Sequence, residues 1–247
     1  ASDVNNVLLN DTFVEQLGTT VNQDRHFMLI KKQSINSLDE SAQRELAKLY
    51  MCGLGTPKNV DKALSLYNKA IDSGSLGAII DLGTCYLFGE GVEQSYKKAF
   101  KFFSEAIEKK DLKRVECGIG YAEAQRELAR LYMYGLGTPK NVVKSLNLYQ
   151  KAINSGSLVA TIDMGTFYFF GKHIEQNYKK AFKLFNEAIG KITSNPDLSQ
   201  SEESSLLRLQ YNVGIMYANG WGIDRNASEA FQFFKNAADG GFIKANL

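Results

Sequence analysis

Apolar residues along this chain recur at helical spacing in short blocks that glycine separates. The first clear block carries its apolar residues on one helical face: Ala42, Leu46, Ala47, Leu49 and Tyr50. Gly53 and Gly55 follow it, and glycine readily ends a helix because it takes positive φ without a Cβ clash. The pattern therefore predicts a helix that ends at about Gly53.

A second block follows directly and has the same periodicity. Pro57 and Asn59 suit the turn and the start of a helix. The next apolar stripe then comprises Ala63, Leu66, Tyr67, Ala70 and Ile71. No run of about four to eight residues alternates apolar and polar positions as a half-buried strand does. The sequence therefore predicts an all-α fold.

This pair of helical blocks is repeated along the chain. Residues 42–109 match residues 124–191 at most positions without a gap, and each long copy divides again at a shift of 36 (78 − 42). Self-similarity at a fixed period is typical of a repeat architecture. Five helix-pair units result, the last of them more divergent: about 42–77, 78–110, 124–159, 160–192 and 209–244.

One motif runs through all five units. In the first unit it comprises Leu46, Ala47, Tyr50, Gly53, Gly55, Lys62, Ala63, Tyr67 and Ala70. This motif resembles the Sel1-like repeat, a relative of the tetratricopeptide repeat. The resemblance implies an α-solenoid, in which antiparallel helix pairs stack into a right-handed α-α superhelix and the first helices line a concave face.

Three parts of the chain depart from the motif. We expect residues 1–40 to form an N-terminal cap, with weak helical patterning over residues 22–32, because an exposed first repeat would leave an apolar face in water. The array then occupies residues 41–247, and the extra residues after the second and fourth units are interpreted as connections: 111–123 and 193–208. Residues 241–247 resemble the opening of another first helix, which favours a chain that stops inside a longer array.

Charge and composition exclude several classes of protein. The 29 basic and 27 acidic residues give a net charge of +2, which is no electrostatic footprint for nucleic acid. The longest apolar runs fall far short of the roughly 20 residues that a membrane span requires, so we expect no direct membrane insertion. The chain carries 3 Cys and 2 His at wide spacing, which predicts neither a metal site nor a bound cofactor.

The candidate catalytic residues form no convincing active site. The Gly-x-Gly pairs lie between two helices and follow no strand, so they are not phosphate loops. Carboxylates such as Glu45, Glu127, Asp81 and Asp163 recur with the units, which favours structural hydrogen bonding. His173 replaces the second glycine of the fourth unit, where we expect a strained loop position rather than a catalytic base. The chain is therefore predicted not to be an enzyme.

The resemblance to tetratricopeptide-like arrays places certain first-helix positions on the concave face. Odd-numbered units supply cations there and even-numbered units supply apolar groups. The predicted groove residues are Arg44, Lys48, Met51, Leu87, Phe88, Arg126, Arg130, Met133, Tyr134, Phe169, Phe170 and Tyr211. For Leu87, Phe88, Phe169 and Phe170, packing under neighbouring helices stays an alternative at this point.

We expect a non-catalytic, monomeric scaffold or adaptor that binds a partner protein or peptide along this groove. A partner with acidic and hydrophobic anchors would suit the alternating surface. Two other functions stay open: a hydrolase of the β-lactamase-like kind ascribed to some members of the family, and an architectural subunit of a larger secretion or membrane-associated complex. Sel1-like arrays occur in bacterial secreted proteins, so we favour a secreted, periplasmic or host-delivered protein over a plain cytoplasmic one.

Overall fold

A computed structural model describes residues 20–36, 39–113 and 119–242 of the chain. These residues form helices and no strand: α2 (Thr20–Asn36), α3 (Glu40–Cys52), α4 (Val60–Asp72), α5 (Leu76–Phe88), α6 (Tyr96–Lys113), α7 (Ile119–Tyr134), α8 (Val142–Asn154), α9 (Leu158–Phe170), α10 (Tyr178–Thr193), α11 (Gln200–Asn219) and α12 (Ala227–Asp239). The chain divides into two compact units: unit 1 extends to Asn141 and unit 2 begins at Val142. The predicted all-α fold is confirmed for the described residues.

Local sequence sets the ends of the helices. Gly53 ends α3 in the left-handed region, with φ of 74°, and its N–H donates to the carbonyl of Leu49. The side-chain oxygen of Asn59 then accepts a hydrogen bond from the N–H of Lys62 and begins α4. Such caps satisfy backbone groups that a helix leaves without an internal partner. The same sequence signals therefore produce a helix, a tight loop and a second helix in each repeat.

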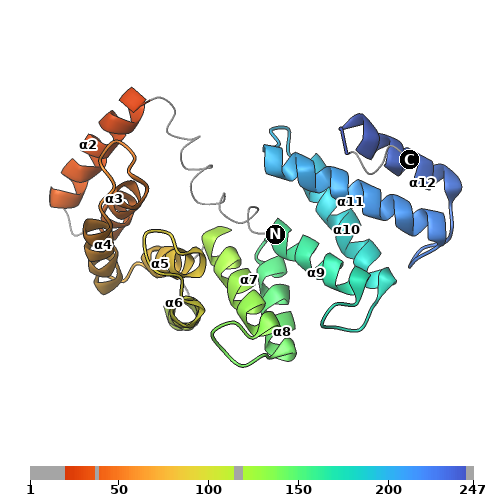
Figure 1. The fold of residues 1–247 in the computed structure, drawn as a ribbon, viewed down its shortest axis with the longest axis horizontal. Coiled ribbons are helices and arrows are strands. Elements are labelled where there is room, and N and C mark those ends of the chain that lie inside the picture. Colours follow the sequence, from red (N-terminus) through yellow and green to blue (C-terminus); the bar gives the residue numbers. More distant parts are fainter. Residues whose placement is uncertain (1–19, 37–38, 114–118, 243–247) are drawn as a thin grey trace. The chain divides into compact units, whose positions relative to one another are not determined.

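Small residues let the two helices of a repeat approach closely. A Cβ on Gly83 of α5 would lie 2.7 Å from the ring of Phe103 of α6. A Cβ on Gly165 would likewise lie 2.7 Å from the ring of Phe185, and a Cβ on Gly214 would lie 2.8 Å from the ring of Phe234. A side chain at these positions would push the helices apart. In each unit, successive antiparallel pairs stack in this manner (Figure 1), which is the local arrangement of an α-solenoid.

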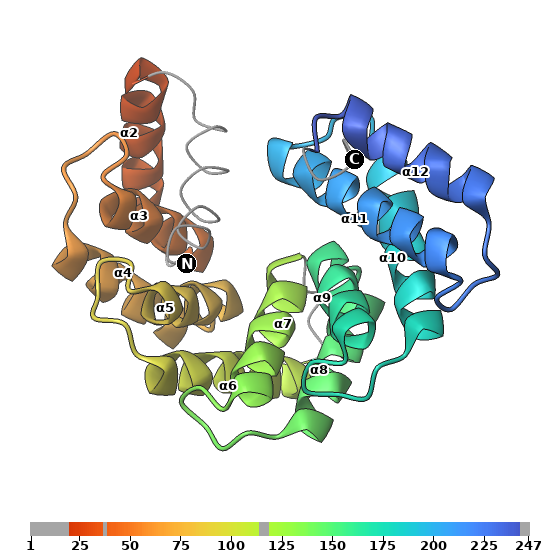
Figure 2. The same cartoon turned by 45° about the vertical axis from the view of Figure 1, so that its right-hand side comes forward.

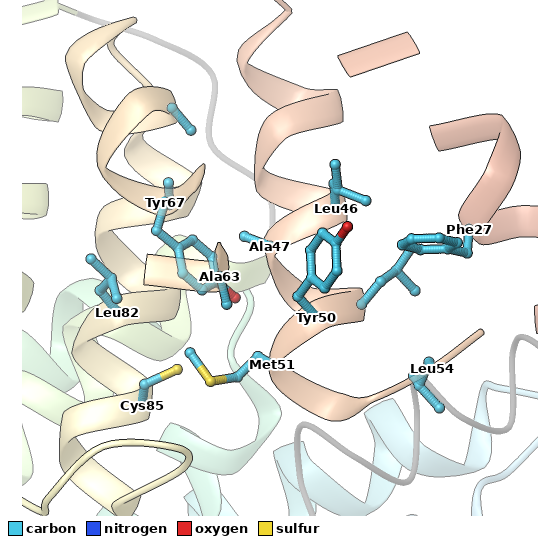
Figure 3. Packing of buried hydrophobic residues seen from close by; sticks show 13 residues of the cluster. Phe27, Leu46, Ala47, Tyr50, Met51, Leu54, Ala63, Tyr67, Leu82 and Cys85 are labelled. Carbon is cyan, nitrogen blue, oxygen red and sulfur yellow. The ribbon is translucent and has the colours of Figure 1, made fainter. Parts of the chain in front are cut away.

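The core of unit 1 lies between α3, α4 and α5. Tyr67, Ala63 and Ala47 are buried at its centre, and Met51 and Cys85 lie beside each other below them (Figure 3). Small and large side chains alternate across the helices, so the layers interdigitate. Unit 2 has its own core between α9, α10 and α11 (Figure 2), built around Phe185, Ile192 and Met216.

Helix α2 occupies the place of a second repeat helix although its sequence lacks the motif. Phe27 of α2 contacts Tyr50 of α3 edge to face, with ring centroids 5.5 Å apart. Phe100 of α6 makes the same contact with Tyr132 of α7, at 5.2 Å. Helix α2 thus packs on the first helix of the first repeat as α6 packs on α7, and the assignment of residues 1–40 as a cap stays a prediction. Residues 1–19 lie outside the described residues.

The long connections expected at 111–123 and 193–208 are largely helical where the structure describes them. Helix α6 runs on to Lys113, α7 begins at Ile119, and α11 begins at Gln200 rather than near residue 209. Ser199 and Glu202 form a capping box that starts α11 early. Residues 200–208 therefore lengthen α11 at its start, because the capping box lies ahead of the repeat motif.

Candidate binding surface

A buried carboxylate joins the first helices α3 and α5 of unit 1. Asp81 of α5 accepts two hydrogen bonds from Arg44 of α3: Nε to Oδ2 at 2.6 Å and Nη2 to Oδ1 at 3.0 Å. The ammonium group of Lys48, one turn further along α3, lies 3.6 Å from the same Oδ2. The Asp81 side chain is only 7% exposed. Both predicted groove cations of the first repeat are thus bound to one carboxylate.

A glycine makes room for this ion pair. A Cβ on Gly77 of α5 would lie 2.7 Å from Cζ, Nε and Nη1 of Arg44, so the guanidinium lies flat against the α5 backbone. Burial lowers the pKa of Arg44, but the hydrogen bond and the charge of Asp81 outweigh burial and raise the pKa. The arginine is therefore a fixed, charged part of the surface.

The predicted cations of the third repeat are also paired. Arg126 and Arg130 of α7 both bond to Glu127 of the same helix, and Nη1 of Arg130 lies 2.9 Å from Glu127 Oε2. Arg126 lies 3.4 Å from Glu123 as well, and its side chain is buried. Arg130 stays half-buried. The structural role predicted for the recurring carboxylates is confirmed for Asp81 and Glu127.

Four predicted groove residues lie in the core instead of on the surface: Met51, Leu87, Met133 and Phe169. The ring of Phe169 packs against Trp221 of the following repeat at 6.1 Å. Met51 similarly faces Gly91 in the loop of its following repeat. Each of the four directly precedes the last residue of a first helix, and Met51 and Phe169 contact the repeat that follows. These side chains cannot reach a partner in this conformation.

The residue after each buried one is more exposed, and Cys52, which follows Met51, is half-buried. Phe88 of α5 is half-buried, Tyr134 of α7 is 41% exposed and Phe170 of α9 is 64% exposed. All three are the last residue of a first helix. Tyr211 of α11 is half-buried and packs against Phe234 and Phe242. In unit 1, Phe88 and Tyr134 thus form an aromatic row at the ends of successive first helices, and binding of a partner along the predicted groove stays a prediction.

In unit 1 this row adjoins a cation. Arg130 and Tyr134 stand four residues apart in α7 and share one face of the helix. Phe88 holds the matching position in α5, which packs directly against α7. We name Phe88, Arg130 and Tyr134 the aromatic–arginine patch. Arginine and tyrosine dominate binding hot spots, because they combine large contact area with directional hydrogen bonds.

The thiols near this surface are poorly suited to nucleophilic chemistry. Burial raises the pKa of the Cys85 thiol to about 12 and raises the pKa of Cys52 as well. Both are therefore protonated at neutral pH, whereas the thiolate is the reactive form. Cys117 lies outside the described residues. Within the described ranges, no three His, Cys, Asp or Glu side chains are grouped as metal ligands.

His173 adopts the backbone conformation that its sequence position indicates. Its φ is 71°, and it is the non-glycine residue with positive φ in the described part of the chain. Its ring packs against Phe167 with centroids 6.4 Å apart. This contact fits a loop position stabilised by packing rather than a catalytic base.

Sequence reasoning did not identify Gly77 as part of the surface. The signal was present in the comparison of the two long copies, because Val159 stands where the first copy has Gly77. A glycine inside a helix, where the other copy carries a β-branched residue, indicates that another group approaches the backbone closely. Here that group is the guanidinium of Arg44.

The stacked helix pairs, the glycine-capped first helices and the recurrent inter-repeat contacts define a helix-pair repeat protein of the tetratricopeptide-like class. A model of the Sel1 repeat matches residues 40–75, 77–111, 122–157, 158–189 and 208–242. The chain therefore belongs to the Sel1 repeat family. No match was found among curated proteins. None of the helices in the described residues has the length and apolar character needed to cross a membrane.

Solved structures of similar fold are Sel1-type proteins of bacteria. A Sel1 repeat protein from Oxalobacter formigenes is 25% identical, with a TM-score of 0.69 over 94% of this chain and 82% of that chain. A protective antigen present in uropathogenic Escherichia coli strains is 23% identical, with a TM-score of 0.60 over 89% of this chain and 50% of that chain. A sel1 repeat protein from Klebsiella pneumoniae is 21% identical, with a TM-score of 0.50 over 89% and 95%. The last two likenesses concern the fold alone.

Proposed function

We propose that the protein is a scaffold that binds a segment of a partner protein at its first-helix surface, with the aromatic–arginine patch as the main contact in unit 1. Helix-pair repeats of this family generally serve protein–protein interaction. The observation that carries the proposal is the position of Tyr134 and Arg130, one turn apart on the exposed side of α7, with Phe88 at the matching place in α5.

The pairing of the cations specifies the partner further. Arg44, Lys48, Arg126 and Arg130 all bind carboxylates of the chain itself, so little uncompensated positive charge faces the solvent there. An incoming acidic group would have to share these cations, whereas an apolar side chain can pack on the exposed parts of Phe88 and Tyr134. The partner segment is therefore recognised by apolar or aromatic anchors first and by acidic groups second.

A peptide-display selection tests this assignment. The full chain is used to select binders from a random peptide library, and the selected peptides are measured against the wild type and the double variant Phe88→Ser/Tyr134→Ser. Loss of two hot-spot rings is expected to weaken binding by about 30-fold or more, which corresponds to about 2 kcal/mol. Arg130→Gln is expected to have a smaller effect, confined to peptides that carry Asp or Glu.

The matched control is Val143→Ser, which removes a 71% exposed apolar side chain from the second helix α8. This variant should bind the selected peptides like the wild type. Equal binding by the double variant, with unchanged circular dichroism, would contradict the proposal, and so would peptides that lose affinity only in the Val143→Ser protein.

A further inference from the structure

Cations without an ion partner gather at the starts of two second helices. Lys97 and Lys101 stand one turn apart at the start of α6, and Lys179 and Lys183 hold the matching positions in α10. Residues four apart share one face of a helix. All four lysines are exposed, and none of them makes an ion pair with another residue in the described part of the chain. Free positive charge therefore lies on these second helices, whereas the cations of α3 and α7 are bound to carboxylates.

The loop of the following repeat adds a cation to each helix start. A Cβ on Gly137 would lie 2.6 Å from the backbone nitrogen of Lys97, and a Cβ on Gly222 would lie 2.6 Å from that of Lys179. Each of these loops carries one exposed cation a few residues further on. A third lysine of each helix start lies over a tyrosine ring, at 4.6 Å in α6 and 5.0 Å in α10. We name the two groups the basic clusters: Lys97, Lys98, Lys101 and Lys140 in unit 1, and Lys179, Lys180, Lys183 and Arg225 in unit 2.

The carboxylate one turn beyond each lysine pair is already bound. Glu105 of α6 lies 2.7 Å from Nζ of Lys109, and Glu187 of α10 lies 2.9 Å from Nζ of Lys191. The other exposed carboxylates described in these helices and loops are fewer than the cations: Glu93, Glu108, Glu175 and Asp224. Each basic cluster therefore keeps an excess of positive charge.

The repeat itself does not require the exposed lysine pairs. At the position of Lys97 the other second helices have different residues: Asp61 in α4, Val143 in α8 and Ser228 in α12. At the position of Lys101 they have Ser65, Asn147 and Gln232. These helices form and pack without a cation at either position, so the lysine pairs of α6 and α10 are not needed for the fold.

We propose that the two basic clusters bind the surface of a membrane that contains anionic lipids, and that no helix enters the membrane. Seven of the eight cations are lysines. A lysine ammonium acts as a point charge on a flexible stem, which suits charged lipid headgroups in any orientation. The proposal is independent of the aromatic–arginine patch, whose arginine is bound to a carboxylate of its own helix.

Aromatic rings beside the basic clusters favour a membrane over an acidic protein segment. Tyr96 precedes Lys97 and is 36% exposed. Trp221 stacks on Tyr178 at 4.8 Å, and both are half-buried. Tyrosine and tryptophan are enriched where lipid meets water. A peptide is usually held in a groove or along a sheet edge, whereas these cations stand on the exposed side of a helix and on a loop.

Flotation with vesicles of defined composition tests the proposal. The 247-residue chain should float with phosphatidylcholine vesicles that contain about 30% phosphatidylserine at about 50 mM salt, and it should be released at about 300 mM salt. It should not float with phosphatidylcholine alone. The double variant Lys101→Gln/Lys183→Gln should weaken membrane partition by about 20-fold or more, because each cation near an anionic surface contributes about fivefold.

The matched control is Lys69→Gln/Lys151→Gln. It lowers the net charge by the same amount and removes exposed lysines from the last turns of α4 and α8, away from the helix starts. This variant should bind the vesicles like the wild type. Phe88→Ser/Tyr134→Ser should also bind them like the wild type, so that membrane binding and partner binding can fail separately.

Absence of flotation with the anionic vesicles would overturn the proposal, and so would equal losses in the two lysine variants, which would mean that only net charge matters. A fluorescent glutamate homopeptide examines the other occupant. If the homopeptide binds through Lys101 and Lys183 while the vesicles do not bind, the basic clusters recognise an acidic protein segment instead.

Discussion

The joint between the first two repeats and the joint between the last two share one backbone pattern but differ in chemistry. The first joint packs α3 and α4 against α5 and α6, and it contains the ion pairs of Asp81 with Arg44 and Lys48. The last joint packs α9 and α10 against α11 and α12, and Trp221 stacks there on Tyr178 at 4.8 Å. One joint is polar and the other is aromatic.

Equivalent positions of the repeats show which residues distinguish the polar joint from the aromatic one. Ile162 and Thr166 stand where the first repeat has Arg44 and Lys48, and Asn212 stands where the second repeat has Asp81. The cations and their carboxylate are therefore replaced together. A buried carboxylate without its cations would be costly, so the three positions depend on one another.

The Gly-x-Gly loops of the two joints also differ, one carrying a polar residue and the other an aromatic one. Glu90 lies between Gly89 and Gly91, and Trp221 lies between Gly220 and Gly222. Burial raises the pKa of Glu90, and Lys58 lowers it by a smaller amount. The comparison teaches that the helix-pair backbone sets where repeats meet, whereas a few coupled side chains set the chemistry of each joint.

The largest difference is expected at the second glycine of the two loops. A Cβ on Gly222 would overlap the backbone of Tyr178, whereas a Cβ on Gly91 would meet the flexible end of Met51. Both glycines have φ of 70° or more, so alanine is strained at either place. Gly222→Ala should lower the free energy of unfolding by about 4 kcal/mol and Gly91→Ala by about 2 kcal/mol. Urea unfolding of both variants measures the difference.

Equal losses in the two glycine variants would show that φ strain alone decides the cost. Met51→Ala should remove the part of the Gly91→Ala loss that comes from the side-chain contact. The Gly222→Ala loss has no such remedy, since the backbone of Tyr178 cannot move aside without distorting α10.

A smaller effect is expected from the carboxylate of the polar joint. Asp81→Ala leaves Arg44 and Lys48 without their shared partner, and it should lower the free energy of unfolding by about 2 kcal/mol, because the 34% exposed Arg44 side chain keeps access to water. Asn212→Ala is the matched change in the aromatic joint and should cost less than about 0.5 kcal/mol. Similar losses in the two variants would contradict the polar character assigned to the first joint.

The smallest effect is a dependence on pH that only the first joint should show. A carboxyl group with a raised pKa in the folded state holds its proton after the unfolded chain has lost it, so its contribution to stability falls as pH rises through the folded pKa. Glu90→Gln should therefore raise the free energy of unfolding by about 0.5 kcal/mol at neutral pH. This gain should vanish below about pH 4, where the wild-type residue is neutral in both states.

Urea unfolding at neutral and acidic pH measures the Glu90 effect. The control is Glu93→Gln, which changes an exposed carboxylate near the same loop. A gain that does not depend on pH, or one that Glu93→Gln reproduces, would show that ionisation of Glu90 is not the cause.

Most of the fold could be predicted because its determinants are local. The glycine after Cys52, the cap at Asn59 and the apolar stripe of α4 each act within a few residues. The family motif could likewise be recognised from the sequence. The start of α11 at Gln200 was harder to predict. The inserted residues carry no apolar stripe, and only the Ser199 cap indicates a helix there.

The candidate surface could be predicted less completely. Met51 and Cys52 are adjacent and both lie near the expected concave face, but the first is buried against the next repeat and the second is only half-buried. A rotation of about 100° per residue decides between these two environments, and helical periodicity does not fix it that finely. The pairing of Arg44 with Asp81 depends on two residues 37 positions apart, which the sequence pattern does not connect.

Helix α2 has a practical consequence for work with fragments. Because Phe27 covers Tyr50, a fragment that starts at the first recognisable motif would expose an aromatic face and invite aggregation. Gly55 also packs on the backbone of Gln23, so the loop of the first repeat would lose its support. A fragment should therefore begin with a second helix, or with α2, and keep the first helix that it covers. Such a boundary lies one helix before the repeat boundary seen in the sequence.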